Sequence, residues 1–344
     1  MMGVRKVIRS LLLPFLLLVS CSGDRDEQVY IAFNLPVEPL YAPCEVKFLN
    51  YTQNATEYLW DFGDGSGSAD FQPVHLYGAP GIYQVTLTAS NRSDSRSLTR
   101  ELRILESEPE VTAPPPGLRL HSFYLKYVDA DGIPVISSGE VPDEALLTVR
   151  RMAIRMLRKI PQVRDKMISY QARIGVMGKD EVTTDIPEHA FLKNDPNTDW
   201  DKRARGLGGT IHVPITTCAE ENVLCYANDP YRSEDIFVHE FAHSIHLMGI
   251  RHVDAQFEAS LRSAYNEALS AGKWDRTYAA TNTEEYWAEG VQSWFNCNTQ
   301  SDPPNGVHNH VNTRAELRDY DRGLYELLRN WFEDNDVQIS CHSH

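Results

Sequence analysis

A proline-rich segment at residues 106–117 divides the sequence into two parts with different hydrophobic patterns. The segment contains Pro109 and the run Pro114-Pro-Pro-Gly117, and proline-rich chain is extended and stiff. Before it, short runs of alternating apolar and polar residues predict β-strands. After it, longer periodic stretches predict helices as well as strands. Because 344 residues suffice for two or three domains, we expect a multidomain protein joined by a linker at 106–117.

Residues 30–105 are predicted to be all-β. The run Tyr83-Gln-Val-Thr-Leu-Thr-Ala89 places its apolar residues on one face. The string Trp60-Asp-Phe-Gly-Asp-Gly65 fits a core tryptophan followed by a tight turn in which glycine adopts positive φ. With Pro73-Val-His-Leu-Tyr77 and Gly81-Ile-Tyr-Gln-Val85, these residues resemble the PKD domain, an immunoglobulin-like β-sandwich. The resemblance implies a spacer rather than a carbohydrate- or protein-binding module.

Residues 118–344 mix strands and helices and are predicted to form one α+β domain. Val141-Pro-Asp-Glu opens a helix that extends to about Ile160. Buried strands are expected at Ala172–Met177 and at Gly206–Val213. Further helices are expected at about 232–248, 254–271, 283–296 and 313–332. The last of them begins with the capping box Thr313-Arg-Ala-Glu316.

The string His239-Glu-Phe-Ala-His243 is the strongest indication of chemistry in the sequence. Residues four apart lie on one face of a helix, so two imidazoles can bind one zinc ion. Glu240 lies one step around the helix, where its carboxylate can take a proton from a water molecule. The alternative is a core helix with two hydrogen-bonded histidines. It would bury two histidines and a glutamate with no function to offset the free-energy cost of burying polar groups.

A catalytic zinc site needs a third protein ligand and one open position. A third histidine in the pattern HExxHxxGxxH is absent, since His246 and Gly249 occupy the positions of its glycine and histidine. His246 lies roughly 10 Å along the helix from the first ligand, so we expect a second-shell or core residue. Glu285 and Glu289 share one face of a later helix, where Glu285 can bind the metal and Glu289 can brace a ligand histidine from the second shell. Glu284 is expected to face solvent.

The motif His239-Glu-Phe-Ala-His243 followed by Tyr278-x6-Glu285-Tyr-Trp-Ala-Glu289 resembles the zinc endopeptidase domain of anthrax lethal factor and its relatives. The resemblance covers residues 235–296 and implies a zincin-type metallopeptidase fold of the glutamate-ligand type. It implies His239, His243 and Glu285 as zinc ligands and Glu240 as general base. Tyr278 would donate a hydrogen bond to the oxyanion of the tetrahedral intermediate. Residues 118–230 show no such match, so a substrate preference is not implied.

Several other residues are weaker candidates for the site. Gly206, Gly208 and Gly209 start a predicted strand that could receive a substrate backbone as an added strand, or could simply form a bulge. Arg203 and Arg205 could bind a substrate carboxylate or lie on the surface. The histidines His308 and His310 lie in a polar loop and are expected to be exposed.

The N-terminus predicts export and lipidation. Arg5, Lys6 and Arg9 precede the apolar run Leu11–Val19, as in a signal peptide covering residues 1–20. Nine apolar residues are too few to span a membrane, which takes about 20. The string Leu18-Val19-Ser20-Cys21 resembles the lipobox of bacterial lipoproteins. It implies cleavage before Cys21, acyl chains on that residue, a tether at 21–29, and a location at the outer membrane or cell surface.

Five cysteines remain after Cys21, and export favours disulfides. Cys218 and Cys225 are close in sequence and could close a small loop. Cys297 and Cys341 could then tie the chain end to the body, which leaves Cys44 as a buried free thiol. Spacing alone does not fix this connectivity.

The charge of the chain excludes one class of partner. The formal net charge is −15, and removal of the three basic residues of the signal peptide makes it −18. Such a chain does not bind nucleic acid phosphates. The residues together predict a lipid-anchored, zinc-dependent endopeptidase that acts on extracellular proteins or peptides. The alternatives are a cell-surface binding lipoprotein with a degenerate zinc domain, and a zinc hydrolase of a different substrate.

Overall fold

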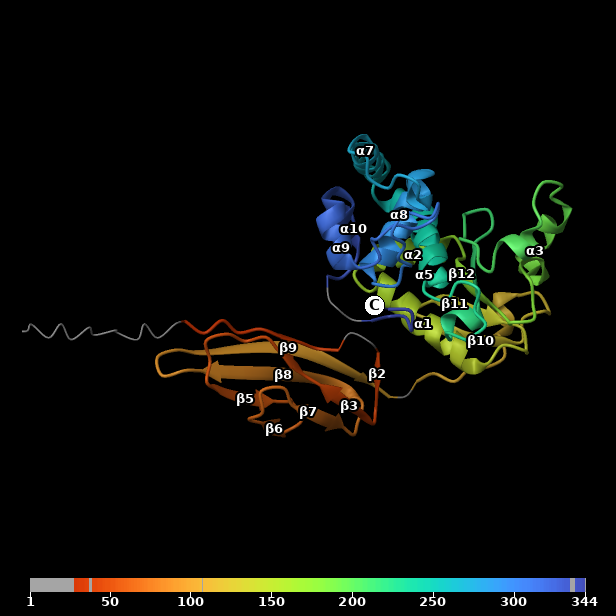
Figure 1. The fold of residues 1–344 in the computed structure, drawn as a ribbon. Helices are drawn as coiled ribbons and strands as arrows, with labels where there is room; N and C mark the ends of the chain where they lie inside the picture. Colours follow the sequence, from red (N-terminus) through yellow and green to blue (C-terminus); the bar gives the residue numbers. More distant parts are fainter. Residues whose placement is uncertain (1–27, 37–38, 107, 335–337, 344) are drawn as a thin grey trace, which may run out of the picture. The chain divides into compact units, whose positions relative to one another are not determined.

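The computed structural model describes residues 28–36, 39–106, 108–334 and 338–343. The predicted signal peptide, Cys21 and most of the tether lie outside these residues. The described chain divides into two compact units, one made mainly of residues 28–102 and the other containing residues 103–343 (Figure 1). Within the described ranges, no helix combines the length and the apolar character needed to cross a membrane.

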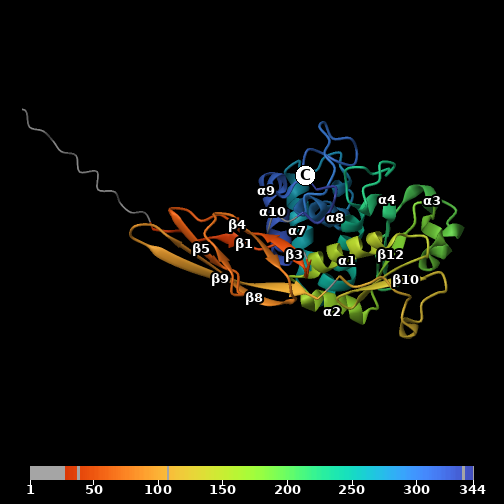
Figure 2. The ribbon, with the colours of Figure 1, turned by 90° about the horizontal axis from the view of Figure 1, so that it is seen from below.

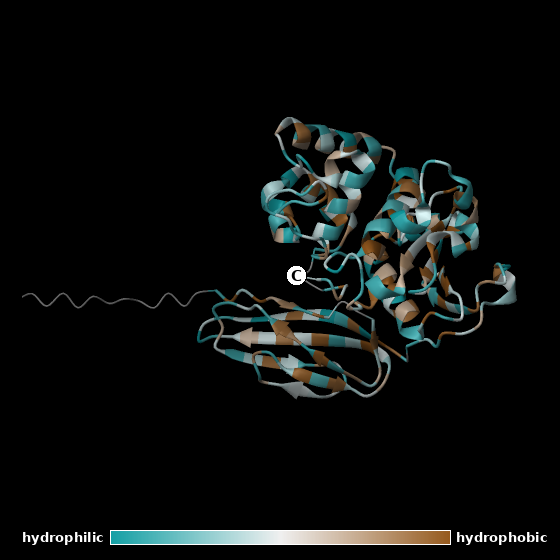
Figure 3. Cartoon of the chain, turned by 45° about the vertical axis from the view of Figure 1, so that its right-hand side comes forward, coloured by the Kyte–Doolittle hydropathy of each residue, from teal (hydrophilic) through white to brown (hydrophobic). Residues whose placement is uncertain are grey.

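The N-terminal unit is a β-sandwich, as predicted. Trp60 is fully buried, and its ring packs against Phe33 and Phe48 at centroid distances of 5.0 and 5.3 Å. Hydrophobic and hydrophilic residues alternate along the strands because successive side chains point to opposite faces (Figure 3). The turn after Trp60 uses Gly63 and Gly65 at φ of 78° and 90°, a conformation that glycine adopts without strain. The strands are β1 (Phe33–Asn34) paired with β4 (Leu49–Asn50), β3 (Cys44–Lys47) paired with β7 (Val74–Tyr77), and a sheet ordered β2 (Leu40–Tyr41), β9 (Ser95–Leu105), β8 (Gly81–Ser90), β5 (Glu57–Asp61) and β6 (Gly67–Ser68).

The C-terminal unit is built on a four-stranded sheet in the order β10-β11-β12-β13. The hairpin β10 (Lys126–Ala130) and β11 (Ile133–Ser137) is antiparallel, whereas β11, β12 (Arg173–Met177) and β13 (Ile215–Ala219) are parallel. Helices α1 (Asp143–Leu157) and α2 (Pro161–Ser169) form the crossover between β11 and β12 (Figure 2). The predicted strand at 172–177 is confirmed as β12.

Two expectations about this unit are wrong in detail. No strand covers 206–213: Leu207 makes only an isolated bridge to Thr217, and the strand itself begins at Ile215. The segment 106–117 is not all linker, because Thr112 exchanges backbone hydrogen bonds of 2.9 and 2.7 Å with Tyr127 of β10. This end of the proline-rich segment is therefore held by the C-terminal unit.

The predicted helices are present with different bounds; the one expected at 232–248 begins at Ile236 and continues through a π-helical turn to Val253. The segment 313–332 is two helices, since the Asp321 side chain interrupts it and caps the second by accepting from the Leu324 N–H at 3.2 Å. The capping box of Thr313 and Glu316 is confirmed, and α2 was not predicted. The helices that follow β13 are α5 (Ile236–Ser244), the π-helical turn η4 (Ile245–Ile250), α6 (Arg251–Val253), α7 (Phe257–Ser270), α8 (Thr283–Trp294), α9 (Arg314–Tyr320) and α10 (Arg322–Trp331). The remaining short helices are α3 (Trp200–Arg203), α4 (Glu220–Val223), and the 3-10 turns η1 (Pro116–Leu118), η2 (Thr183–Asp185), η3 (Pro187–Asn194) and η5 (Tyr278–Ala280).

Candidate metal centre

Helix α5 carries both predicted histidine ligands and is fixed at both ends. Asp235 caps its first turn by accepting a hydrogen bond from the Val238 N–H at 2.9 Å. Near its end, the Trp287 indole N–H of α8 donates to the carbonyl of Ala242 at 2.9 Å. Helix α5 thus packs between β13 and α8, and its histidine face is directed at α8.

The structure brings His239, His243 and Glu285 together. The Nε2 atoms of the two histidines are 3.2 Å apart, and Glu285 Oε2 lies 3.1 Å from His239 Nε2 and 3.3 Å from His243 Nε2. These side chains are only 10%, 12% and 16% exposed. Asn282 starts α8 by accepting from the N–H groups of residues 284 and 285, which fixes the backbone of the glutamate. Two imidazole nitrogens and one carboxylate oxygen around one point are a donor set that suits zinc.

The surrounding charges favour a cation at this point. Burial lowers the pKa of His239, but the hydrogen bond to the Glu285 carboxylate and the charges of Glu240, Glu289 and Glu285 outweigh this effect and raise the pKa to about 10. Burial raises the pKa of Glu285, but the hydrogen bonds and charges of His239 and His243 hold it well below its usual range. The carboxylates therefore stabilise positive charge between the two imidazoles.

The partner of the other nitrogen of His239 is Gln292, which the sequence analysis missed. Gln292 is fully buried on α8, and its Oε1 lies 2.9 Å from His239 Nδ1. Its Nε2 donates to the carbonyl of Asp235 at 3.0 Å. Glu289, the expected brace, lies 3.8 Å from Nδ1 and instead accepts a hydrogen bond from Asn298 at 3.0 Å. The sequence did contain a signal for this role. Gln292 follows Glu285 by seven positions on the same helix, and residues seven apart share a face.

Glu240 and Tyr278 line the same cleft as the three clustered side chains. The cleft has a volume of about 470 Å³. The backbone N–H of Tyr278 donates to the Val307 carbonyl at 2.7 Å, and its ring centroid lies 6.3 Å from that of His239. Burial, followed by the charge of Glu285, raises the pKa of Tyr278. Its phenol therefore keeps its proton at neutral pH and can donate a hydrogen bond.

The glycine segment forms a wall of the cleft and packs directly against α5. A Cβ atom at Gly208 would lie 2.7 Å from the His243 Cβ, and one at Gly206 would lie 2.9 Å from the Thr217 carbonyl. A Cβ at Gly209 would lie 3.1 Å from the backbone of Ile215. These glycines allow the chain to approach α5 and β13 closely. In place of the expected regular strand, the segment makes a single bridge to β13. Only Leu207 uses its N–H and C=O toward β13, at 3.3 and 2.8 Å.

Several predicted residues lie away from the cluster. His246 is a core residue rather than a second-shell one: it is fully buried, bonded to Glu258 at 2.7 Å and packed on Phe257. His308 was expected to be exposed but is buried, and its Nε2 lies 3.0 Å from Glu234. The loop that carries His308 folds back against the residues before α5. Sequence spacing does not reveal this contact.

Three further expectations concern polar side chains. Arg205 is structural, since it pairs with Glu221 through bonds of 2.7 and 3.0 Å. Glu284, expected to face solvent, is half-buried at the edge of the cleft. His310 is exposed, as predicted.

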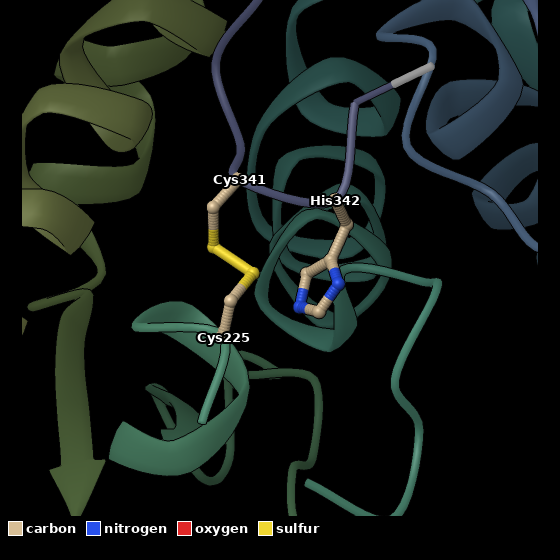
Figure 4. A group of neighbouring side chains, drawn as sticks. All are labelled: Cys225, Cys341 and His342. Carbon is tan, nitrogen blue, oxygen red and sulfur yellow. A yellow bond between two sulfur atoms is a disulfide. The ribbon is translucent and has the colours of Figure 1, made fainter. Parts of the chain in front are cut away.

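The disulfide connectivity differs from both expected pairs. Cys225 is joined to Cys341, while Cys218 and Cys297 are buried free thiols and Cys44 is a free thiol that is partly exposed rather than buried (Figure 4). Cys218 lies in β13, whose residues are all buried, and Cys225 lies beyond α4, so their side chains are separated despite the short spacing.

His342 lies beside this disulfide and forms with the two sulfurs a group of the size of a metal site (Figure 4). The metal ligand is the thiolate, and sulfurs joined in a disulfide are not thiolates. The ring of His342 instead meets the carbonyls of Asn222 and Arg232 at 2.8 and 3.1 Å. This group therefore anchors the chain end near the loop that precedes α5.

Comparison with known proteins assigns the N-terminal unit. Residues 43–105 match the PKD domain family. These residues form a PKD domain. Collagenase ColA of Bacillus cereus is 34% identical over 55 residues, which are 16% of this chain and 6% of that protein. The microbial collagenase of Vibrio alginolyticus is 51% identical over 41 residues, which are 12% of this chain and 5% of that protein. The chain therefore spans about one twentieth of the length of these curated relatives.

Two solved PKD domains are similar to part of this chain. The PKD1 domain of Vibrio anguillarum Epp is 26% identical, with 24% of this chain and 98% of that chain covered and a TM-score of 0.21. The PKD1 domain of the Vibrio cholerae metalloprotease PrtV is 31% identical, with 22% and 94% covered and a TM-score of 0.20. The similarity to proteases is confined to the PKD domain.

Proposed function

We propose that this chain is a zinc-dependent endopeptidase with a zincin-type catalytic domain at residues 118–344. The observation that carries the proposal is the convergence of His239, His243 and Glu285 within 3.3 Å of one another, in a cleft that Glu240 and Tyr278 also line. Three protein ligands with an open side are typical of catalytic rather than structural zinc sites. The occurrence of similar PKD domains in collagenases and in a metalloprotease supports the same conclusion.

The proposed zinc ligands are His239 Nε2, His243 Nε2 and a carboxylate oxygen of Glu285. A zinc ion supplies Lewis-acid chemistry: it lowers the pKa of water and polarises a carbonyl group. Glu240 accepts the proton of the attacking water and delivers it to the departing amine. Tyr278 donates a hydrogen bond to the oxygen that becomes negative in the tetrahedral intermediate. Gln292 holds His239 in the tautomer that leaves the Nε2 lone pair free for the metal.

The wall at Gly206–Gly208 is the proposed docking edge for the substrate backbone. Leu207 directs its N–H and C=O at β13, so those of Gly206 and Gly208 are directed to the other side, where the cleft lies. An extended peptide can pair with such an edge as an added strand. This places its scissile carbonyl between the wall and the histidine face of α5.

The proposed location is the bacterial cell envelope, with a lipid anchor at Cys21. The lipobox-like string that ends at Cys21 supports it. Two or more acyl chains hold a protein stably at a membrane. In this arrangement the PKD domain is a spacer between the membrane and the catalytic domain, and the substrates are extracellular proteins or peptides.

The test is digestion of a diverse peptide mixture by the chain from residue 22 onward, read by mass spectrometry. The matched control is Glu240→Gln, which removes the general base with little change in size. We expect cuts with the wild-type chain that are absent with the control, while both variants bind one equivalent of zinc. Equal zinc content with no difference in cleavage would contradict the peptidase and favour a binding lipoprotein.

A further inference from the structure

The cleft has a single basic side chain among acidic ones. In the described part of the chain, Arg203 is the one lysine or arginine that lines the cleft, whereas the glutamates that line it are Glu234, Glu240, Glu284, Glu285 and Glu289. Arg203 is exposed, and no carboxylate of the described residues lies within ion-pair distance of its guanidinium. It is thus a free cation at the rim of an acidic cleft.

Two arginines near Arg203 or near the cleft-lining Glu284 are paired, unlike Arg203. Arg205, two residues away, is paired with Glu221 at 2.7 Å. Arg251, which lies 3.7 Å from the cleft-lining Glu284, is paired with Glu258 at 2.8 Å. The guanidinium of Arg203 instead remains available to a ligand.

The side chain of Arg203 is also held in place. Its guanidinium carbon lies 5.8 Å from the centroid of the Trp200 ring, within the range of a cation–π contact. The Trp200 indole N–H in turn donates to Asp195 at 2.9 Å. Helix α3 is fixed through Asp201, which accepts bonds of 2.9 and 3.0 Å from the N–H and hydroxyl of Thr184. The guanidinium is therefore carried by a fixed helix, so less conformational entropy is lost when it binds a ligand.

Arg203 is close to the proposed chemistry. It lines the same cleft as Glu240 and Tyr278. Along the chain it precedes Gly206 by three residues, so it lies beyond the Gly206 end of the proposed docking edge. A group bound by Arg203 therefore belongs to a part of the substrate a few residues from the scissile bond.

We infer that Arg203 is a specificity-determining residue that binds a carboxylate of the substrate, an inference that rests on the proposed peptidase function. Guanidinium groups match carboxylates by paired N–H donors. The carboxylate can belong to an aspartate or glutamate side chain or to the C-terminus of a peptide. Because both sources offer the same group, the experiment separates them.

The test uses fluorogenic peptides built on a sequence that the wild-type chain cleaves. One residue at a time, within three positions on each side of the cut, is varied among Glu, Gln and Lys. A second set compares a free C-terminal carboxylate with its amide. We expect the wild-type chain to show a KM about tenfold lower for the favoured carboxylate peptide than for its neutral counterpart, the difference of one charge-assisted hydrogen bond. Arg203→Gln removes this difference, and Arg203→Glu reverses it in favour of Lys.

The matched control is Lys202→Gln, since Lys202 is adjacent, exposed and paired with Asp199 at 2.7 Å. We expect Lys202→Gln to keep the wild-type preference and the wild-type kcat on neutral peptides. Peptide affinity is measured in parallel on a Glu240→Gln background, which reports binding without turnover. A wild-type chain that cleaves without charge preference, or a preference that survives Arg203→Gln, overturns the inference and leaves the peptidase intact. Failure of the wild-type chain to cleave any peptide overturns the proposed function instead.

Discussion

Replacement of Gln292 by leucine removes the acceptor that lies 2.9 Å from Nδ1 of His239. The Nδ1–H group is buried, and a buried donor without a partner costs about 1–3 kcal/mol. The imidazole can avoid this cost by shifting its proton to Nε2, the atom that faces Glu285 and His243. That tautomer has no lone pair for the metal. The substitution therefore acts on zinc binding and not only on stability.

The expected loss follows from this geometry. Removal of the partner of a ligand histidine typically weakens metal affinity by about 10–100-fold, which is roughly 1.4–2.7 kcal/mol. Gln292→Glu keeps an acceptor for Nδ1 and loses only the donor to the Asp235 carbonyl. It should bind zinc more tightly than the leucine variant. Glu289→Gln should have a smaller effect than Gln292→Leu, because Glu289 lies 3.8 Å from Nδ1 and can keep its contact with Asn298 as an amide.

The assay is competition for zinc between each apo-protein and a chromogenic chelator at neutral pH, with thermal unfolding recorded on the same samples. A leucine variant with the wild-type zinc affinity would refute the reasoning, since it would show that Gln292 does not select the tautomer of His239. Equal losses in the leucine and glutamate variants would also refute it, because they would assign the effect to the bond with Asp235.

Three further predictions concern catalysis, the disulfide and pH. Tyr278→Phe should lower kcat by about 10²–10³-fold with unchanged zinc content, since it removes one donor to the oxyanion; a wild-type kcat in steady-state assays would exclude that role. Cys341→Ser opens a bridge between residues 116 apart and should reduce the free energy of unfolding by about 4–5 kcal/mol, measured in urea beside Cys44→Ser, which breaks no bridge and should unfold like the wild type. Burial lowers the pKa of His189 from 6.5 to about 4, so its stabilising contribution should be complete above pH 6.5 and fall by up to about 3 kcal/mol as the pH drops toward 4. Urea unfolding of the apo-protein at pH 7 and pH 5 should therefore show a steeper loss for the wild type than for His189→Gln, and parallel losses would contradict the assignment.

Local patterns in the sequence predicted much of the secondary structure. The alternation of residues 83–89 and the position of Trp60 predicted the sandwich and its core, since both depend on which face a side chain occupies. The capping box at Thr313 and the helix of His239 and His243 depend on contacts within four residues, so the sequence alone specifies them. The break at Asp321 was missed because its carboxylate also accepts bonds of 2.7 Å from Trp274 and Tyr286, which are distant in sequence.

The sequence by itself determined that two imidazoles share one helical face and that Glu285 recurs on a later helix, because both are matters of spacing. Only the tertiary structure decided how those helices meet. The packing of α5 on α8 places Gln292, rather than Glu289, within hydrogen-bond distance of His239. The path of the chain end brings Cys341 to Cys225. It also left Arg203 free in the cleft while Arg205 is paired. The physical reason is common to all three: hydrogen bonds and disulfides need atoms within a few ångströms, and for residues far apart in the chain that distance is fixed by packing.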